Sequence, residues 1–162
     1  MNPKLRSMTS LFFQREDGLL CLYRIGSRVA NHLYVGACGG HFEKDELDDP
    51  TACALREMRE ELGLSPEDIK DLTLRYVTLR YYKGEIRQNY YFFAKLNGEK
   101  ALSSAEGNLR FFTWEELKSA PMPVSARHMM DHYLAQGRFT DHRYAGTTEP
   151  GGTRFVRLES FD

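Results

Sequence analysis

The clearest structural signal in the chain lies in residues 49–63, which read DPTACALREMREELG. Asp49 can cap the free N–H groups at the start of a helix, and Pro50 suits the first helical position. Gly63 tolerates the left-handed conformation that commonly ends a helix. These start and stop signals predict a helix from Pro50 to Leu62.

Three glutamates of this predicted helix, Glu57, Glu60 and Glu61, stand at positions i, i+3 and i+4 and therefore share one face. Apolar residues fall on the opposite face: Leu55, Met58 and Leu62. Like charges at this spacing repel one another by about 0.2–0.5 kcal/mol per pair. A divalent cation would remove that repulsion, and Mg2+ prefers hard oxygen ligands. The triplet alone therefore indicates either a metal site or a solvated acidic helix face.

The residues around the triplet extend this pattern. A Gly39-Gly40 turn precedes the helix, where backbone can approach a ligand or direct a carbonyl oxygen at a metal. From Gly40 onward, the chain resembles the Nudix box, written GX5EX7REUXEEXGU with U apolar. All nine final positions match, in Arg56-Glu57-Met58-Arg59-Glu60-Glu61-Leu62-Gly63-Leu64. The resemblance indicates a Nudix hydrolase.

Membership of this family would fix both fold and reaction type. It implies an α+β (α/β) fold, namely an α/β/α sandwich around a mixed β-sheet. It also implies a single domain over residues 1–162, with the box at residues 40–64. The implied activity is hydrolysis of a pyrophosphate bond in a nucleoside diphosphate linked to a further group X.

The same resemblance assigns roles to the box residues. It places the catalytic Mg2+, for which Mn2+ can substitute, on the three box carboxylates: Glu57, Glu60 and Glu61. A backbone carbonyl of Gly39 or Gly40 would assist them. Arg56 would orient a neighbouring carboxylate through a bidentate contact, with an ordinary surface salt bridge as the alternative.

One position departs from the family pattern. Counting back from Arg56, the middle glutamate of the box falls at Asp48, with two extra residues between Gly40 and that position. Alternatively, Glu46 keeps the spacing from Gly40 and the insertion follows it. Because this acid mainly braces the loop in the family, either alignment is compatible with activity.

A second, later stretch also resembles Nudix enzymes. Residues 106–112 and 114–117 are similar to the acidic loop, strand and helical turn of MutT-type members. Glu106 matches a loop carboxylate that either binds a metal or helps activate the attacking water. The alternative interpretation of Glu106 is a solvated acid in a turn.

This later stretch is also similar to the oxidised-nucleotide triphosphatases. That similarity makes an oxidised or otherwise modified purine nucleoside triphosphate, such as 8-oxo-dGTP, the leading substrate hypothesis, with the monophosphate and pyrophosphate as products. An ADP-ribose or dinucleoside polyphosphate hydrolase would share the box and differ in its loops. A non-catalytic nucleotide sensor would usually have lost box carboxylates, and all three are present here.

Candidate contacts to the nucleotide are less specific. His41 stands where MutT-type boxes often have a lysine, and it would either touch phosphate or be a solvated loop residue. Arginines considered for phosphate contact are Arg24, Arg28, Arg80 and Arg87. The aromatic residues at positions 81–82 and 90–93 would either stack on a purine or form core.

The remaining elements follow from periodicity and turn residues. Two β-hairpins are expected, one from residues 7–14 and 19–23 and one from residues 72–82 and 86–96. Further expected elements are a strand at 33–38, a strand at 109–113, a helical turn at 114–118, a helix at 125–135 and a final hairpin from 140–145 and 154–158.

Composition excludes some classes of protein. The 22 basic and 23 acidic side chains give a formal charge of −1, which argues against a nucleic-acid polymer as partner. The three cysteines lack the spacing of a zinc site, which fits a reducing cytoplasm. No stretch reaches the roughly 18–20 apolar residues that span a bilayer, so we expect no membrane partner. A monomer and a homodimer are both compatible with the sequence.

Overall fold

The computed structural model describes residues 2–26 and 31–159, so Arg28 lies outside the described residues. Its strands are β1 (Lys4–Arg15), β2 (Gly18–Arg24), β3 (Tyr34–Gly36), β4 (Ile69–Tyr82), β5 (Glu85–Leu96), β6 (Gly107–Thr113), β7 (Arg143–Glu149) and β8 (Gly152–Leu158). They form one sheet in the order β3-β2-β1-β5-β4-β7-β8, with β6 paired to β2. The pairs β1–β5 and β4–β7 are parallel and the others antiparallel, which makes the sheet mixed.

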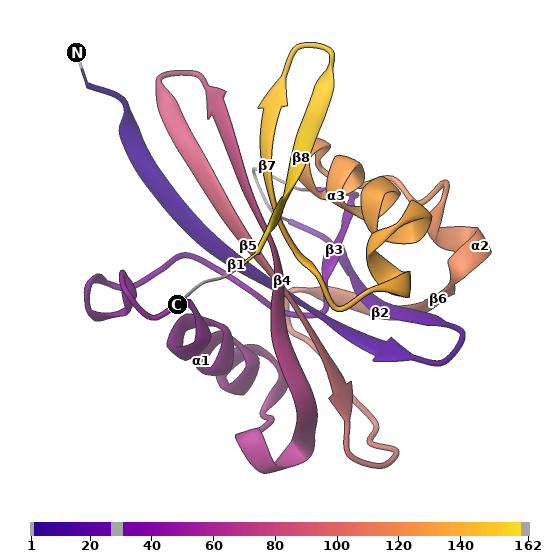
Figure 1. The fold of residues 1–162 in the computed structure, drawn as a ribbon. Helices are drawn as coiled ribbons and strands as arrows, with labels where there is room; N and C mark the ends of the chain where they lie inside the picture. The colour runs from indigo at the N-terminus through magenta and orange to yellow at the C-terminus, as the bar shows by residue number, and fades with distance from the viewer. Residues whose placement is uncertain (1, 27–30, 160–162) are drawn as a thin grey trace.

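Helices cover both faces of this sheet. The helices are α1 (Pro50–Leu62), α2 (Trp114–Leu117) and α3 (Val124–Ala135), with short 3-10 helices η1 (Lys44–Glu46), η2 (Pro66–Asp68) and η3 (Gly137–Phe139). Figure 1 shows α1 on one side of the sheet and α3 on the other. Within the described residues, no helix is long and apolar enough to cross a membrane. The arrangement confirms the predicted α/β/α sandwich around a mixed sheet.

Two hydrophobic clusters result from the alternation of side chains along the central strands. Leu11 and Phe13 of β1 face α1, where they share a cluster with Met58. Phe12, between them, faces the other side and joins the cluster that contains Met129 of α3. The same alternation places Phe92 and Phe93 of β5 in opposite clusters, so these two aromatic residues are core.

Helix α1 begins and ends where its capping residues predict. The Asp49 carboxylate accepts a hydrogen bond from the Ala52 N–H at 3.0 Å, and Pro50 is the first helical residue. Gly63 has φ +67° and donates its N–H to the carbonyl of Arg59 at 3.0 Å. Cys53, Ala54 and Met58 are the buried residues of the helix. Because this apolar stripe packs on the sheet, the glutamate face is turned toward the Gly39-Gly40 turn.

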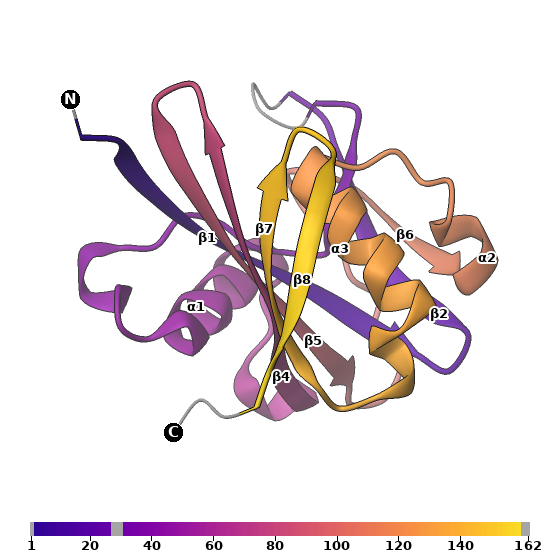
Figure 2. The ribbon, with the colours of Figure 1, turned by 45° about the horizontal axis from the view of Figure 1, so that its top comes forward.

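The other expected elements are present with shifted ends. The predicted strand at 33–38 is shorter, since only Tyr34–Gly36 pairs regularly with β2. The strands of the final hairpin extend closer to the turn than expected: β7 ends at Glu149 and β8 begins at Gly152. Figure 2 shows this hairpin beside α3, and His128 of α3 bonds to Thr153 of β8 at 2.8 Å. Helix α3 therefore packs on the sheet face opposite α1 and contacts the β7–β8 end of the sheet.

Candidate active site

Arg56 lies at the centre of a network of carboxylates. Its Nε and Nη2 donate to the two oxygens of Glu46 at 2.5 and 3.1 Å, which is a bidentate contact. Its Nη1 donates to Glu57 at 2.9 Å and to Glu60 at 3.1 Å. Nη2 also reaches the carbonyl of His41 at 3.0 Å. One guanidinium therefore fixes two box carboxylates and the loop before the helix, as the orienting role requires.

The structure places Glu46, rather than Asp48, in the bracing position. The Glu46 side chain is 8% exposed and contacts Arg56, whereas Asp48 is exposed. Hydrogen bonds from Arg56 lower the pKa of Glu46 to about 2, against the opposing effect of burial. The two-residue insertion in the box therefore follows Glu46, where it forms the loop that leads into α1.

Glu61 occupies a different electrostatic environment from Glu57 and Glu60. Its carboxylate accepts a hydrogen bond from the Gly39 N–H at 3.3 Å. Burial, together with the neighbouring charges of Glu106 and Glu57, raises its pKa to about 8. A partly buried carboxylate beside two others is the kind of environment that a divalent cation stabilises.

These donors fit a divalent-cation site that water and substrate phosphate would complete. Among the described residues, no three acidic, histidine or cysteine side chains converge closely enough to hold a metal ion by themselves. Magnesium sites commonly use one or two carboxylates together with water and substrate phosphate. Glu61 beside Glu57 and Glu106 supplies hard oxygen donors of this kind.

Close backbone contacts require glycine at position 39, and Gly40 leaves room for the Glu57 carboxylate. A Cβ on Gly39 would lie 2.2 Å from the carbonyl oxygen of Thr9, and Gly39 has φ +153°. A Cβ on Gly40 would lie 2.4 Å from Oε1 of Glu57. The Gly40 carbonyl accepts a hydrogen bond from the Thr9 N–H at 2.9 Å. Because that carbonyl is engaged with β1, we favour Gly39 over Gly40 as the backbone ligand to a metal.

Glu106 reaches the box although it lies far from it in the sequence. Strand β6 pairs with β2, and the register sets Gly107 opposite Arg24. Nη2 of Arg24 contacts Oε2 of Glu106 at 2.7 Å, and the charge of Glu106 acts on Glu61. The sheet therefore brings Glu106, Arg24 and Glu61 into one neighbourhood, as the MutT-type resemblance predicts.

A pocket of about 140 Å3 lies beside this neighbourhood, between the sheet and the start of α3. Gly39, Glu61 and Arg24 line it on the side of the box. Arg80 lines it from β4, but His41 is not among the lining residues. Instead, Nε2 of His41 lies 3.0 Å from Nη2 of Arg6, outside this pocket. Lining residues without a sequence signal include Asn89, Pro123, Val124, Ser125 and Ala126.

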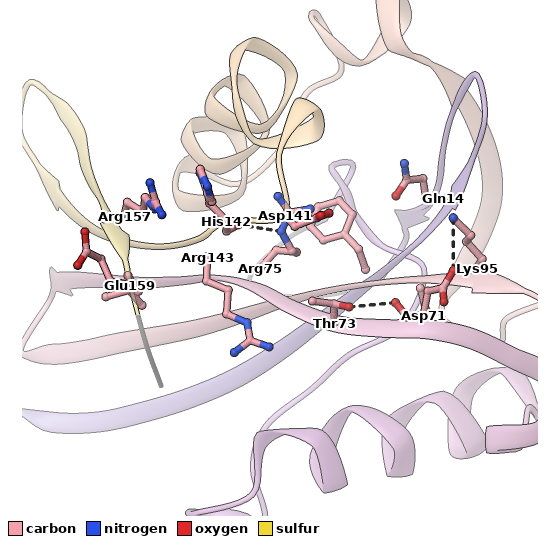
Figure 3. Close-up of a pocket in the computed structure, with 13 residues that line it drawn as sticks. Gln14, Asp71, Thr73, Arg75, Lys95, Asp141, His142, Arg143, Arg157 and Glu159 are labelled. Atoms are coloured by element: carbon pink, nitrogen blue, oxygen red, sulfur yellow. Dashed lines mark hydrogen bonds and ion pairs between the residues drawn. The ribbon is translucent and has the colours of Figure 1, made fainter. Parts of the chain in front are cut away.

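A larger hollow of about 570 Å3 lies elsewhere, between the start of β4 and the ends of β5 and β8 (Figure 3). None of its lining residues belongs to the box. Three of its charged groups also have partners: Lys95 contacts Asp71 at 3.4 Å, and Arg75 donates to three backbone carbonyls. The smaller pocket is therefore the candidate active site.

Comparisons with known proteins agree with this geometry. The NUDIX domain family model matches residues 4–133, whereas curated protein sequences give no significant match. The fold is similar to that of a MutT protein from Bacillus halodurans, with TM-score 0.66, 21% identity and coverage of 93% of this chain and 97% of that one. An Ap4A hydrolase from C. elegans gives TM-score 0.64, 16% identity and coverage of 85% and 99%.

An ADP-ribose pyrophosphatase from Streptococcus suis is also similar, with TM-score 0.59, 14% identity and coverage of 88% of this chain and 98% of that one. The family match spans most of the chain, and Glu61 of the box lines the candidate pocket. The chain therefore belongs to the Nudix family and is a pyrophosphohydrolase that acts on acid anhydrides. Nudix hydrolases generally use divalent metal ions and act on small nucleotides.

Replacement of Glu46 by Gln should lower the free energy of unfolding at neutral pH by roughly 2–4 kcal/mol, because Arg56 loses a buried charged partner. The pKa of Glu46 is lowered from 4.5 to about 2 in the folded protein. Its stabilising contribution is therefore complete above about pH 4.5 and is lost as the pH falls toward about 2. Urea unfolding across this range measures the difference.

Asp48→Asn is the matched control, because Asp48 is the exposed alternative to Glu46. It should change the free energy of unfolding by less than about 0.5 kcal/mol. Equal destabilisation by the two changes, or an effect of Glu46→Gln that persists at low pH, would contradict the assignment of Glu46 as the bracing acid.

Proposed function

We propose that this Nudix enzyme is a magnesium-dependent hydrolase of a nucleoside diphosphate linked to X, with an oxidised or otherwise modified purine nucleoside triphosphate such as 8-oxo-dGTP as substrate. The observation that carries the proposal is the position of Glu61, which lines the pocket and lies within electrostatic reach of Glu57 and Glu106. Mn2+ is expected to replace Mg2+, because both accept hard oxygen ligands.

The proposed site residues have distinct tasks. Arg56 holds Glu57 and Glu60 at fixed angles, and the Gly39 N–H holds Glu61. A bound divalent cation would neutralise charge on the phosphate oxygens. A Glu106 carboxylate oxygen can accept the proton of the attacking water, or bind the cation, from its place beside Arg24.

The substrate assignment is supported by similarity of two kinds. The later stretch of sequence resembles oxidised-nucleotide triphosphatases, and one of the similar structures is a MutT protein. The pocket, at about 140 Å3, is smaller than the 300–1,000 Å3 usual for sites that enclose drug-sized ligands. It therefore suits a single ring system such as one nucleobase, with X outside it.

We also propose that residues 1–162 form a single domain, because β7 and β8 extend the same sheet beyond the residues matched by the family model. Cys21, Cys38 and Cys53 are free and buried, which supports the cytoplasm as the compartment. A monomer and a homodimer are both compatible with this proposal.

A phosphate-release screen tests the proposed reaction. Purified protein should hydrolyse at least one nucleotide from a panel of ordinary triphosphates, oxidised triphosphates, dinucleoside polyphosphates and nucleoside diphosphate sugars when Mg2+ is present. Turnover should fall below detection in excess EDTA, because the acidic site repels the anionic substrate without a cation. Undiminished turnover with EDTA would exclude the metal mechanism, and preference for a diphosphate sugar would exclude the triphosphate assignment.

Replacement of Glu106 by Gln should reduce kcat by roughly 10- to 1000-fold, because the amide cannot accept a proton or supply an anionic oxygen. The fold should persist, since Glu106 lies at the surface and contributes a single ion pair, to Arg24. Steady-state kinetics on the best substrate of the panel measure the effect.

Glu115→Gln provides the control. Glu115 is an exposed residue of α2 that pairs with Lys118. Glu116 is less suitable as a control, because its carboxylate accepts a hydrogen bond from the Thr113 N–H at 2.9 Å and so caps α2. If Glu106→Gln were as active as Glu115→Gln, water activation would belong to the box carboxylates alone.

A further inference from the structure

Three arginines form a row across neighbouring strands of the sheet. The parallel register of β1 and β5 sets Arg6 beside Arg87, and the antiparallel register of β5 and β4 sets Arg87 beside Arg80. Residues in register on adjacent strands point to the same face of a sheet. We name Arg6, Arg87 and Arg80 the arginine row.

This row is unfavourable for folding. Like charges directly opposite one another destabilise a strand pair. Glu85 is the one carboxylate shown to contact the row within the described ranges, and it lies 3.4 Å from both Arg6 and Arg87. The Tyr82 ring contacts Arg80 and also Arg87, which lie 4.6 and 4.8 Å from its centroid. Three positive charges thus share one carboxylate, which leaves a net positive surface.

The row connects the candidate active site to a second hollow. Arg80 and Arg87 line the pocket that contains Glu61. Arg6 lines a neighbouring hollow of about 430 Å3 together with Lys4 and His41. Burial and the charge of Arg6 lower the pKa of His41, in keeping with a positive environment there. A ligand that leaves the pocket across Arg87 would therefore pass over a continuous positive surface.

We propose that the arginine row binds an anionic part of group X. This inference rests on the proposed function, since it takes the pocket beside Glu61 as the nucleotide site. Guanidinium groups bind phosphate oxygens through charge-assisted, often paired hydrogen bonds. The row therefore selects substrates whose X carries phosphate, such as nucleoside triphosphates or dinucleoside polyphosphates, over those whose X is a neutral sugar.

Binding of inorganic tripolyphosphate tests the row without catalysis. Calorimetric titration in EDTA at low ionic strength should show binding to the wild-type protein. Arg87→Gln and Arg6→Gln should each weaken it by roughly 10-fold or more, because a charge-assisted contact is lost. Arg154→Gln is the matched control: Arg154 is an exposed strand arginine in register with Thr147 and Leu79, on the opposite sheet face. No binding by the wild type, or equal binding by all variants, would overturn the proposal.

Kinetics distinguish this proposal from the proposed function itself. If the protein hydrolyses nucleotides, the ratio of kcat/KM for a triphosphate to kcat/KM for a nucleoside diphosphate sugar should fall at least about tenfold in Arg87→Gln. An unchanged ratio in an active enzyme would overturn the proposed role of the arginine row and leave the proposed function standing. Absence of all turnover would contradict the proposed function. The tripolyphosphate titration would still decide whether the arginine row binds phosphate.

Thermal unfolding separates a binding role from a structural one. Arg87→Gln should leave Tm unchanged or raise it, because the change removes repulsion between neighbouring strands. A variant with lowered Tm that binds tripolyphosphate as tightly as the wild type would assign these arginines to the fold and overturn the proposal.

Discussion

The site depends on the guanidinium group of Arg56. Its bidentate contact with Glu46 ties the loop before α1 to the helix, and its other nitrogen reaches Glu57 and Glu60. Without such a cation, the three carboxylates on this helix face would repel one another and their side chains would move apart in water. One side chain that is itself only 15% exposed therefore ties the loop to the glutamate face of the helix.

Opposite charges divide the candidate site into two parts. Carboxylates gather where α1 meets the Gly39-Gly40 turn, and arginines gather where β1, β5 and β4 run side by side. A phosphate chain has negative oxygens that need both a cation and nearby donors during transfer. In the proposed binding mode, a phosphate chain would lie between these two parts, with the bond to be broken on the acidic side.

Local signals in the sequence predict α1 well, because Asp49 and Gly63 act on the backbone beside them. These local signals do not show whether Asp48 or Glu46 is the middle acid of the box. That depends on which acid the folded loop buries against Arg56. The arginine row could not be predicted either. Arg6 and Arg87 are 81 residues apart and meet through a parallel pairing that alternation along single strands does not reveal. Likewise, nothing in the sequence at the start of α3 indicates that these residues line a pocket.

The central claim is that Arg56 positions the carboxylates that bind the divalent cation. Titration of Mn2+ into the wild-type protein and into Arg56→Lys tests it most directly, because lysine keeps the positive charge and loses the planar, multidentate contact. With the fold retained in circular dichroism, Arg56→Lys should bind Mn2+ roughly 10- to 100-fold more weakly, as expected when a partner that orients metal ligands is lost. Equal Mn2+ affinity in the two folded proteins would contradict the claim.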